Sequence, residues 1–155
     1  MISVLLSFGS NLGDRRKTLD GAWYALGQTA QIEAVQLSSF YETESVGGPA
    51  NQPKYLNAAG IIQTTIPPEN LLAILQKIEA DFGRIRAERW GARTLDIDIV
   101  LYGDRIVESP FLVIPHLEML HRQFVLDPAK EIAADWIHPL TRKTIGEHWQ
   151  ELHFG

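Results

Sequence analysis

The chain has 155 residues, of which 45% are hydrophobic and none is cysteine, and its formal net charge is −5. This length and composition predict one compact domain, residues 1–155, with enough apolar material for a core. The acidic balance argues against nucleic acid as a partner, and the lack of cysteine excludes disulfides, thiolate metal sites and cysteine nucleophiles.

No segment has the pattern of a targeting or membrane-spanning sequence. The apolar run at residues 1–8 is short, lacks a basic leader and is ended by Gly9. No apolar stretch approaches the roughly 18 residues that a membrane helix needs. We therefore expect a cytoplasmic protein and, because the sequence indicates no large exposed apolar surface, a monomer.

In the first half of the chain, apolar runs alternate with turn-forming residues. Residues 2–8 are mostly β-branched or apolar and predict a buried strand, which ends in the turn cluster at 9–14. Apolar residues then recur at helical spacing up to Gly27. Residues 32–41 predict a second strand, bent near Ser38 and Ser39, and residues 43–53 predict a long loop rich in glycine and proline.

The second half repeats this order. Residues 55–65 predict a strand, residues 67–82 a helix that opens on two prolines, and residues 95–101 the clearest strand of the chain. Residues 105–108 predict a short partner strand, and the remainder a short helix, irregular segments and a helix near 145–152. The order predicts an α+β protein with a ferredoxin-like sandwich: a mainly antiparallel sheet, covered by helices on one face, with the tail from Pro110 decorating that core.

Two aspartates on the predicted strand 95–101 are the first candidates for chemistry. Asp96 and Asp98 are two positions apart, so their side chains point to the same side, roughly 6.6 Å apart along the strand. Hard cations such as Mg²⁺ prefer such oxygen ligands and complete their coordination with water and phosphates. The alternative is a polar strand face in solvent, but strands disfavour aspartate and two like charges repel unless a cation joins them.

A cluster of arginines precedes this strand in an otherwise acidic chain. Arg84, Arg86, Arg89 and Arg93 lie within ten residues, in a segment without clear periodicity. Their planar, permanently charged donors match phosphate oxygens, although a solvated charge run competes as the interpretation of Arg86 and Arg89. Together with the aspartates, this loop predicts a magnesium-nucleotide site.

The same region resembles a known family. Residues 89–100, with the sequence Arg-Trp-Gly-Ala-Arg-Thr-Leu-Asp-Ile-Asp-Ile-Val, resemble the signature of hydroxymethyl-dihydropterin pyrophosphokinases. Shorter segments at 8–13, 39–43, 52–58, 114–116 and 122–124 resemble other parts of that family in the same order. The resemblance runs almost from end to end.

This resemblance implies a folate-pathway enzyme that moves the pyrophosphoryl group of ATP to the hydroxymethyl group of a reduced pterin and releases AMP. It implies that two Mg²⁺ ions are held by Asp96 and Asp98, and that Arg84 and Arg93 stabilise the transferring group. The implied ATP-binding residues are Gln76, Glu79, Arg84, Arg86, Trp90, Arg93, Ile99, His116 and Arg122. The implied pterin-binding residues are Thr43, Val46, Gly47, Tyr55, Asn57 and Phe124.

The chemistry of several of these residues suits the implied roles. Asn57 offers a donor and an acceptor to the edge of a heterocycle, and Tyr55 and Phe124 can stack on a flat ring. The chain also departs from the family, with Phe111 and Val113 where a basic residue and a threonine are common. Leu117 takes a place where an aromatic residue is also found, and Ser45 takes one where proline is common.

Two other function classes fit the aspartate strand alone. A metal-dependent nucleotidyltransferase would use the same Asp-x-Asp pair but would release pyrophosphate from ATP. A non-catalytic nucleotide-binding module is also compatible with a ferredoxin-like fold. Neither alternative needs Asn57 and a pair of ring-stacking aromatic residues.

Overall fold

The computed structural model describes residues 1–11, 13–44, 54–82 and 95–154. The strands are β1 (Ile2–Ser10), β2 (Ile32–Leu37), β3 (Tyr41–Thr43), β4 (Tyr55–Thr64), β5 (Asp96–Tyr102), β6 (Val107–Glu108) and β7 (Val113–Ile114). The helices are α1 (Arg15–Gly27), α2 (Pro68–Phe82), α3 (Gln123–Ala133) and α4 (Ile145–Phe154), with a 3-10 helix at Met119–His121.

The main sheet has the strand order β2-β4-β1-β5, and every neighbouring pair is antiparallel. β1 is a central strand: its Gly9 lies opposite Asn57 of β4 on one side and Asp96 of β5 on the other. This order, with α1 after the first strand and α2 before the last, confirms the predicted ferredoxin-like α+β sandwich.

The predicted strand 32–41 is divided into two strands in the structure. β2 and β3 pair with the same strand, β4, but their registers differ: Leu37 lies opposite Gly60, and Tyr41 lies opposite Asn57. The chain thus advances four positions on the β2–β3 side and three on the β4 side. One extra residue interrupts the ladder here, as in a β-bulge, and this explains the bend expected near Ser38.

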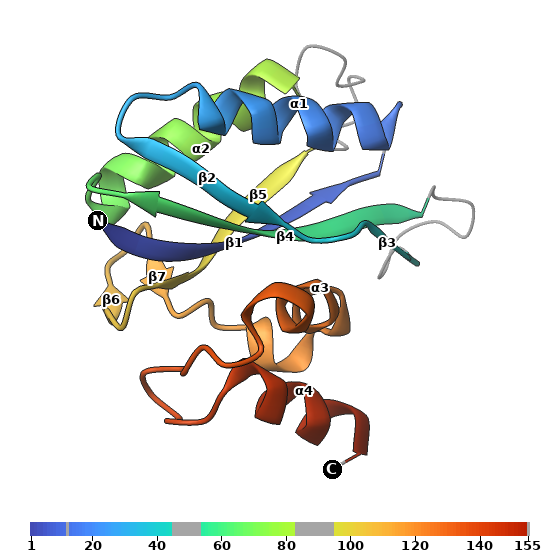
Figure 1. Cartoon of the computed structure of the whole chain (residues 1–155), viewed down its shortest axis with the longest axis vertical. Coiled ribbons are helices and arrows are strands. Elements are labelled where there is room, and N and C mark those ends of the chain that lie inside the picture. The colour runs from blue at the N-terminus through green and yellow to red at the C-terminus, as the bar shows by residue number, and fades with distance from the viewer. Residues whose placement is uncertain (12, 45–53, 83–94, 155) are drawn as a thin grey trace.

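Helices cover both faces of the sheet, so the expectation of a single covered face was wrong. α1 and α2 pack on one face, while α3 packs on the other, with α4 packed against α3 on the side away from the sheet (Figure 1). Each face has its own apolar cluster: Val4, Leu6 and Phe8 of β1 contribute to the first, and Leu5 contributes to the second. The sheet is apolar on both sides, and the chain after Pro115 supplies the second layer.

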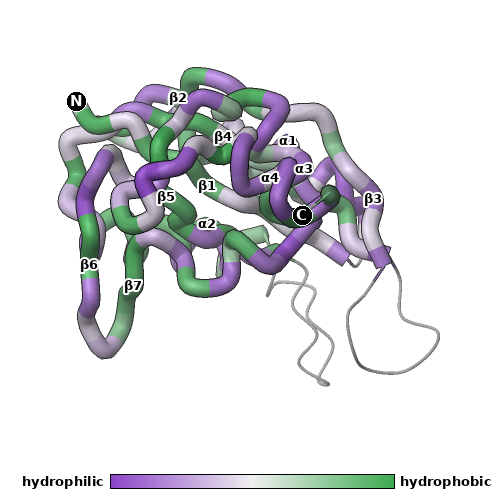
Figure 2. The backbone as a smooth tube through the Cα atoms, turned by 90° about the horizontal axis from the view of Figure 1, so that it is seen from below, coloured by the Kyte–Doolittle hydropathy of each residue, from purple (hydrophilic) through white to green (hydrophobic). Residues whose placement is uncertain are grey.

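Two details of the C-terminal region differ from the sequence-based expectation. The short strand β6 pairs with β7 and not with β5, and the β6–β7 hairpin extends from the body of the molecule (Figure 2). α3 is a regular 11-residue helix although it contains Pro128. α4 begins as predicted, with a capping box in which Thr144 and Glu147 bind each other's backbone N–H groups at 3.0 and 2.9 Å.

Candidate active site

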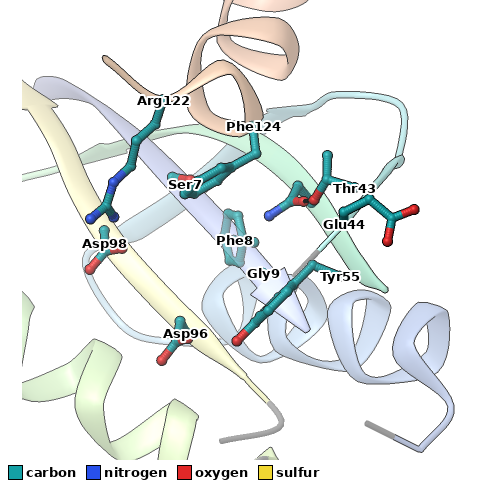
Figure 3. A pocket seen from close by; sticks show the side chains of 11 residues that line it. Ser7, Phe8, Gly9, Thr43, Glu44, Tyr55, Asp96, Asp98, Arg122 and Phe124 are labelled. Atoms are coloured by element: carbon teal, nitrogen blue, oxygen red, sulfur yellow. Dashed lines mark hydrogen bonds between the residues drawn. The ribbon is translucent and has the colours of Figure 1, made fainter. Parts of the chain in front are cut away.

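A pocket of about 210 Å³ lies between the sheet and the start of α3. Figure 3 shows its walls: Phe124 and Arg122 project from the α3 side, and the two aspartates and Tyr55 rise from the sheet. The lining residues are Ser7, Phe8, Gly9, Thr43, Glu44, Tyr55, Asn57, Asp96, Asp98, Arg122 and Phe124.

Strand alternation and register bring these residues together from distant parts of the sequence. On three adjacent strands, Gly9 lies between Asn57 and Asp96, and residues that lie directly opposite each other share a face of the sheet. A side chain at Gly9 would crowd this face, because a Cβ atom there would lie 3.2 Å from Nδ2 of Asn57. Glycine at the end of β1 therefore leaves room in the pocket for the amide.

The acidic side of the pocket contains Asp96 and Asp98. Asp98 is half exposed, and its Oδ2 lies 4.0 Å from Nε2 of His116. Figure 3 also shows the guanidinium of Arg122 directed toward Asp98. Burial, followed by the negative charge of Asp96, raises the pKa of the Tyr55 hydroxyl.

These two carboxylates fit Mg²⁺ as a bound cation. Mg²⁺ is usually held by one or two carboxylates and completes its octahedral shell with water and substrate phosphates. Among the residues that the structure describes, no group of three or more histidine, aspartate or glutamate side chains is close enough to form a closed metal cage. An open pair of carboxylates beside a pocket matches the chemistry of Mg²⁺ better than that of a structural metal.

The opposite side of the pocket offers neutral polar groups and aromatic rings, with the carboxylate of Glu44 beside Thr43 (Figure 3). The Thr43 hydroxyl donates to Oδ1 of Asn57 at 2.5 Å, and Asn57 is only 4% exposed. Tyr55 and Phe124 are partly exposed to the pocket, and the guanidinium carbon of Arg122 lies 5.5 Å from the centre of the Phe124 ring. This side of the pocket can bind a flat heterocycle by its edge and its faces.

The structure thus brings together seven of the residues singled out in the sequence: Thr43, Tyr55, Asn57, Asp96, Asp98, Arg122 and Phe124. His116 lies next to this group, because its Nε2 is 4.0 Å from Oδ2 of Asp98. Glu79 lies close to β5, where its carboxylate accepts a hydrogen bond from the backbone N–H of Ile97 at 2.7 Å. Gln76 is exposed on α2 and does not line the pocket. The Ile99 side chain is buried in the first apolar cluster, so only its backbone is available to a ligand.

Six predicted site residues lie outside the residues that the structure describes: Val46, Gly47, Arg84, Arg86, Trp90 and Arg93. Conversely, sequence reasoning did not single out Ser7, Gly9 and Glu44, which line the pocket. The available signal was a polar residue and a glycine in an otherwise apolar strand, since glycine in a strand often marks the close approach of another group.

Comparison with known proteins relates this pocket to a family. The sequence profile of the family described as 7,8-dihydro-6-hydroxymethylpterin-pyrophosphokinase matches residues 5–134. Two curated relatives carry the name 2-amino-4-hydroxy-6-hydroxymethyldihydropteridine pyrophosphokinase. The Synechocystis protein is 44% identical over 92% of this chain and 72% of its own length, and the Haemophilus influenzae protein is 44% identical over 90% and 86%.

The fold is also found in solved structures. A Plasmodium falciparum HPPK-DHPS crystal structure aligns with a TM-score of 0.77 at 14% sequence identity. The alignment covers 97% of this chain but only 45% of the Plasmodium chain, so the likeness concerns the fold of one part of that protein. The curated relatives match over most of their length, and on that ground the chain belongs to the 7,8-dihydro-6-hydroxymethylpterin-pyrophosphokinase family.

Proposed function

We propose that this chain transfers the pyrophosphoryl group of ATP to the hydroxymethyl group of 6-hydroxymethyl-7,8-dihydropterin, giving the pterin diphosphate and AMP in folate biosynthesis. The observation that carries the proposal is the composition of the pocket. One sheet face presents the carboxylates of Asp96 and Asp98 and, two strands away, the hydrogen-bonded pair of Asn57 and Thr43. A reaction between a metal-bound phosphate and a neutral heterocycle needs both kinds of group in one cavity.

The pterin binds at the Asn57 side. A pterin carries ring nitrogens, an amino group and a carbonyl on one edge, and the buried Asn57 amide can meet donors and acceptors on that edge. The Thr43 hydroxyl holds Oδ1 of Asn57 and so supports the orientation of the amide. Tyr55 and Phe124 contact the ring faces.

ATP binds at the acidic side with Mg²⁺. Asp96 and Asp98 hold two Mg²⁺ ions, which when bound neutralise phosphate charge and favour ionisation of a nearby hydroxyl. Arg122 lies beside Asp98 and is placed to meet a phosphate oxygen, as is Nε2 of His116. Arg84 and Arg93 stabilise the transferring group and Arg86 assists ATP; these three roles rest on the family resemblance alone.

The transfer is an in-line substitution at the β-phosphorus. A bond forms between the hydroxymethyl oxygen and the β-phosphorus, and the bond from the β-phosphorus to the oxygen that bridges to the α-phosphorus breaks. That oxygen leaves with AMP, and the hydroxyl proton passes to solvent. The protein orients both substrates in the pocket, which is the main source of rate in such transfers.

Phosphorus NMR of the protein with ATP, Mg²⁺ and 6-hydroxymethyl-7,8-dihydropterin tests this proposal. We expect signals of AMP and of a pterin diphosphate to appear together. Release of pyrophosphate would identify a nucleotidyltransferase instead, and binding of ATP without turnover would identify a regulatory module.

The chain acts as one domain and as a monomer, in the cytoplasm where ATP is available, and without nucleic acid. Its net charge of −5 supports the last point, because it disfavours a polyanionic partner. No helix in the described part of the chain is long and apolar enough to cross a membrane. Light scattering coupled to gel filtration measures the oligomeric state, and a mass near twice 17.4 kDa would contradict the monomer.

A further inference from the structure

Outside the pocket, a glutamate on α3 contacts the connection between β2 and β3. The Glu131 carboxylate accepts three hydrogen bonds: from the Ser39 backbone N–H at 3.0 Å, from the Ser39 hydroxyl at 3.1 Å and from the Tyr41 hydroxyl at 2.7 Å. None of these residues lines the pocket. They join the helix of one layer to the point where the edge of the sheet changes register.

Ser39 lies in the bulge between the two strands. Its neighbour Ser38 still pairs with β4, donating its N–H to the Ala59 carbonyl at 2.8 Å and accepting the Ala59 N–H on its hydroxyl at 2.9 Å. The ladder resumes only at Tyr41, one residue out of step. The Ser39 N–H is therefore directed away from the strand, and Glu131 supplies its acceptor.

This single extra residue decides which side chain of β3 faces the pocket. With it, Thr43 lies opposite Tyr55 and its hydroxyl reaches Asn57. Without it, Glu42 would lie opposite Tyr55 and Thr43 would turn to the other face, because a slip of one residue reverses every side chain of a strand. A carboxylate would then occupy the place where the structure has a neutral hydroxyl.

In the described part of the chain, few other contacts fix the register of β3. It is three residues long and pairs with β4 only through Tyr41, Glu42 and Thr43. On the opposite face, Glu42 forms an exposed ion pair with Arg15 at 2.8 Å, and exposed pairs contribute little. The Glu131 hydrogen bonds anchor the face that carries the pocket, while Phe40, just before β3, packs against the first apolar cluster.

We propose that Glu131 is a positioning residue for the pterin side of the pocket: it holds the bulge, and the bulge sets the register in which Thr43 meets Asn57. The inference rests on the proposed function, since it assumes that Thr43 and Asn57 bind the pterin. Glu131 does not touch the substrate, so its effect passes through Thr43.

A carboxylate is the group that this position requires. An ionised carboxylate only accepts hydrogen bonds, and here it meets three donors. Burial and the hydrogen bond to Glu131 raise the pKa of the Tyr41 phenol to about 12, so Tyr41 remains a donor at any working pH. A glutamine would direct an N–H group at one of these donors, which makes Glu131→Gln an isosteric variant that breaks the arrangement.

The test compares the affinities for two ligands in four variants. Calorimetry with Mg²⁺ measures the Kd of a non-hydrolysable ATP analogue, and then the Kd of the pterin with that analogue saturating. In Glu131→Gln, we expect pterin binding to weaken about threefold to tenfold while the nucleotide Kd stays within twofold. Asp135→Asn is the control: it removes an exposed carboxylate just beyond α3 that makes no hydrogen bond or ion pair with the other described residues, and it should match wild type.

A double-variant cycle tests whether Glu131 acts through Thr43. Thr43→Val removes the hydroxyl and weakens pterin binding by itself, and adding Glu131→Gln to it should then weaken binding by less than twofold. The inference is overturned if Glu131→Gln binds the pterin as wild type does, if it weakens both ligands equally, or if its full effect persists in the Thr43→Val background.

Hydrogen exchange keeps the inference testable if the proposed function itself fails. Wild-type protein that binds no pterin would overturn the function. In that case amide exchange in residues 39–43 still reports the bulge: we expect faster exchange there in Glu131→Gln than in wild type or Asp135→Asn, with β1 unchanged. Equal exchange in all three proteins would overturn the anchoring role of Glu131.

Discussion

The carboxylate of Glu79 on α2 accepts a hydrogen bond from the backbone N–H of Ile97 on β5, with a nitrogen–oxygen distance of 2.7 Å. Among the described residues, β5 lies at the edge of the sheet, and this N–H has no neighbouring strand there to pair with. Ile97 lies between Asp96 and Asp98, and Glu79 thereby helps to hold the segment that carries both aspartates.

Replacing Glu79 by alanine should affect both stability and activity. Loss of a charged acceptor leaves the Ile97 N–H unpaired, so we expect the free energy of unfolding to fall by about 1–3 kcal/mol. AMP release should fall as well, because Asp96 and Asp98 lose part of their support. Urea unfolding and an AMP assay measure the two effects. Lys77→Gln, an exposed change on the same helix, should alter neither stability nor AMP release. Equal stability and equal AMP release in the two variants would contradict the role of Glu79.

Asparagine at position 98 should remove activity and leave the fold intact. Loss of a partner that only orients a metal ligand typically costs about 10- to 100-fold in affinity or activity, and loss of a ligand itself should cost at least as much. The Asp98 side chain is half exposed, so its replacement should change the thermal midpoint little. Full AMP release by Asp98→Asn at saturating Mg²⁺, or by wild type in excess EDTA, would exclude Asp98 as a metal ligand.

Alanine at position 60 should destabilise the first apolar cluster by overpacking. A Cβ atom at Gly60 would lie 2.6 Å from Cζ3 of Trp23 and 3.0 Å from Cε1 of Phe8, two rings that already pack edge to face. Such insertions lower the free energy of unfolding by about 1–3 kcal/mol. Each kcal/mol lost lowers the midpoint of thermal unfolding by about 2–4 °C in a chain of this size. Gly27→Ala is the matched control, since its Cβ would make only an ordinary contact at 3.5 Å with Ala34. Similar thermal midpoints for the two variants would show that the rings around Gly60 move to accommodate a methyl group, and would contradict the prediction.

Stability should decrease as the pH falls below about 6.5, the ordinary pKa of histidine. Burial lowers the pKa of His138 and of His148, whose rings lie 5.7 Å apart. The unfolded chain therefore binds protons in a range where the folded chain does not, and protonation favours unfolding. The negative charge of Glu151 raises the pKa of His148 and so opposes the effect of burial, whereas the positive charge of Lys143 lowers it further.

Urea midpoints between pH 5 and pH 8 measure this effect. In His138→Asn the side-chain oxygen can replace Nδ1 as the acceptor for the Leu140 and Thr141 N–H groups. The urea midpoint of this variant should therefore fall less between pH 8 and pH 5 than that of wild type. An identical pH dependence in both proteins would assign the loss to other groups.

The sequence predicted the elements whose pattern depends on local neighbours. The alternation in β5 and the apolar spacing in α2 each predicted their element to within one or two residues at the ends described. The same alternation placed Asp96 and Asp98 on one face, where the structure has them beside the pocket.

The features that were missed depend on contacts between distant residues. The helix after Pro115 was expected to be short, whereas α3 has 11 residues with Pro128 inside it and packs on the second face of the sheet. The bend near Ser38 was predicted, but the change of register at Ser39 has no local pattern, because it is defined against β4 and held by Glu131, 92 residues further along the chain. Gly9 was expected in a turn, and its place in the pocket follows from the extension of β1 to Ser10 and from its two strand neighbours.

The two apolar clusters have a consequence for synthesis on the ribosome. Every buried residue of the first cluster lies at or before Ile114, whereas most of the second cluster comes from α3 and its neighbours. A nascent chain that has emerged only to Ile114 therefore contains a complete first core, yet its second sheet face, with Leu5, Ile61 and Val100, is open to water. It carries Asp96 and Asp98 but lacks the wall that Arg122 and Phe124 provide, so the site is completed only when the start of α3 has also left the exit tunnel.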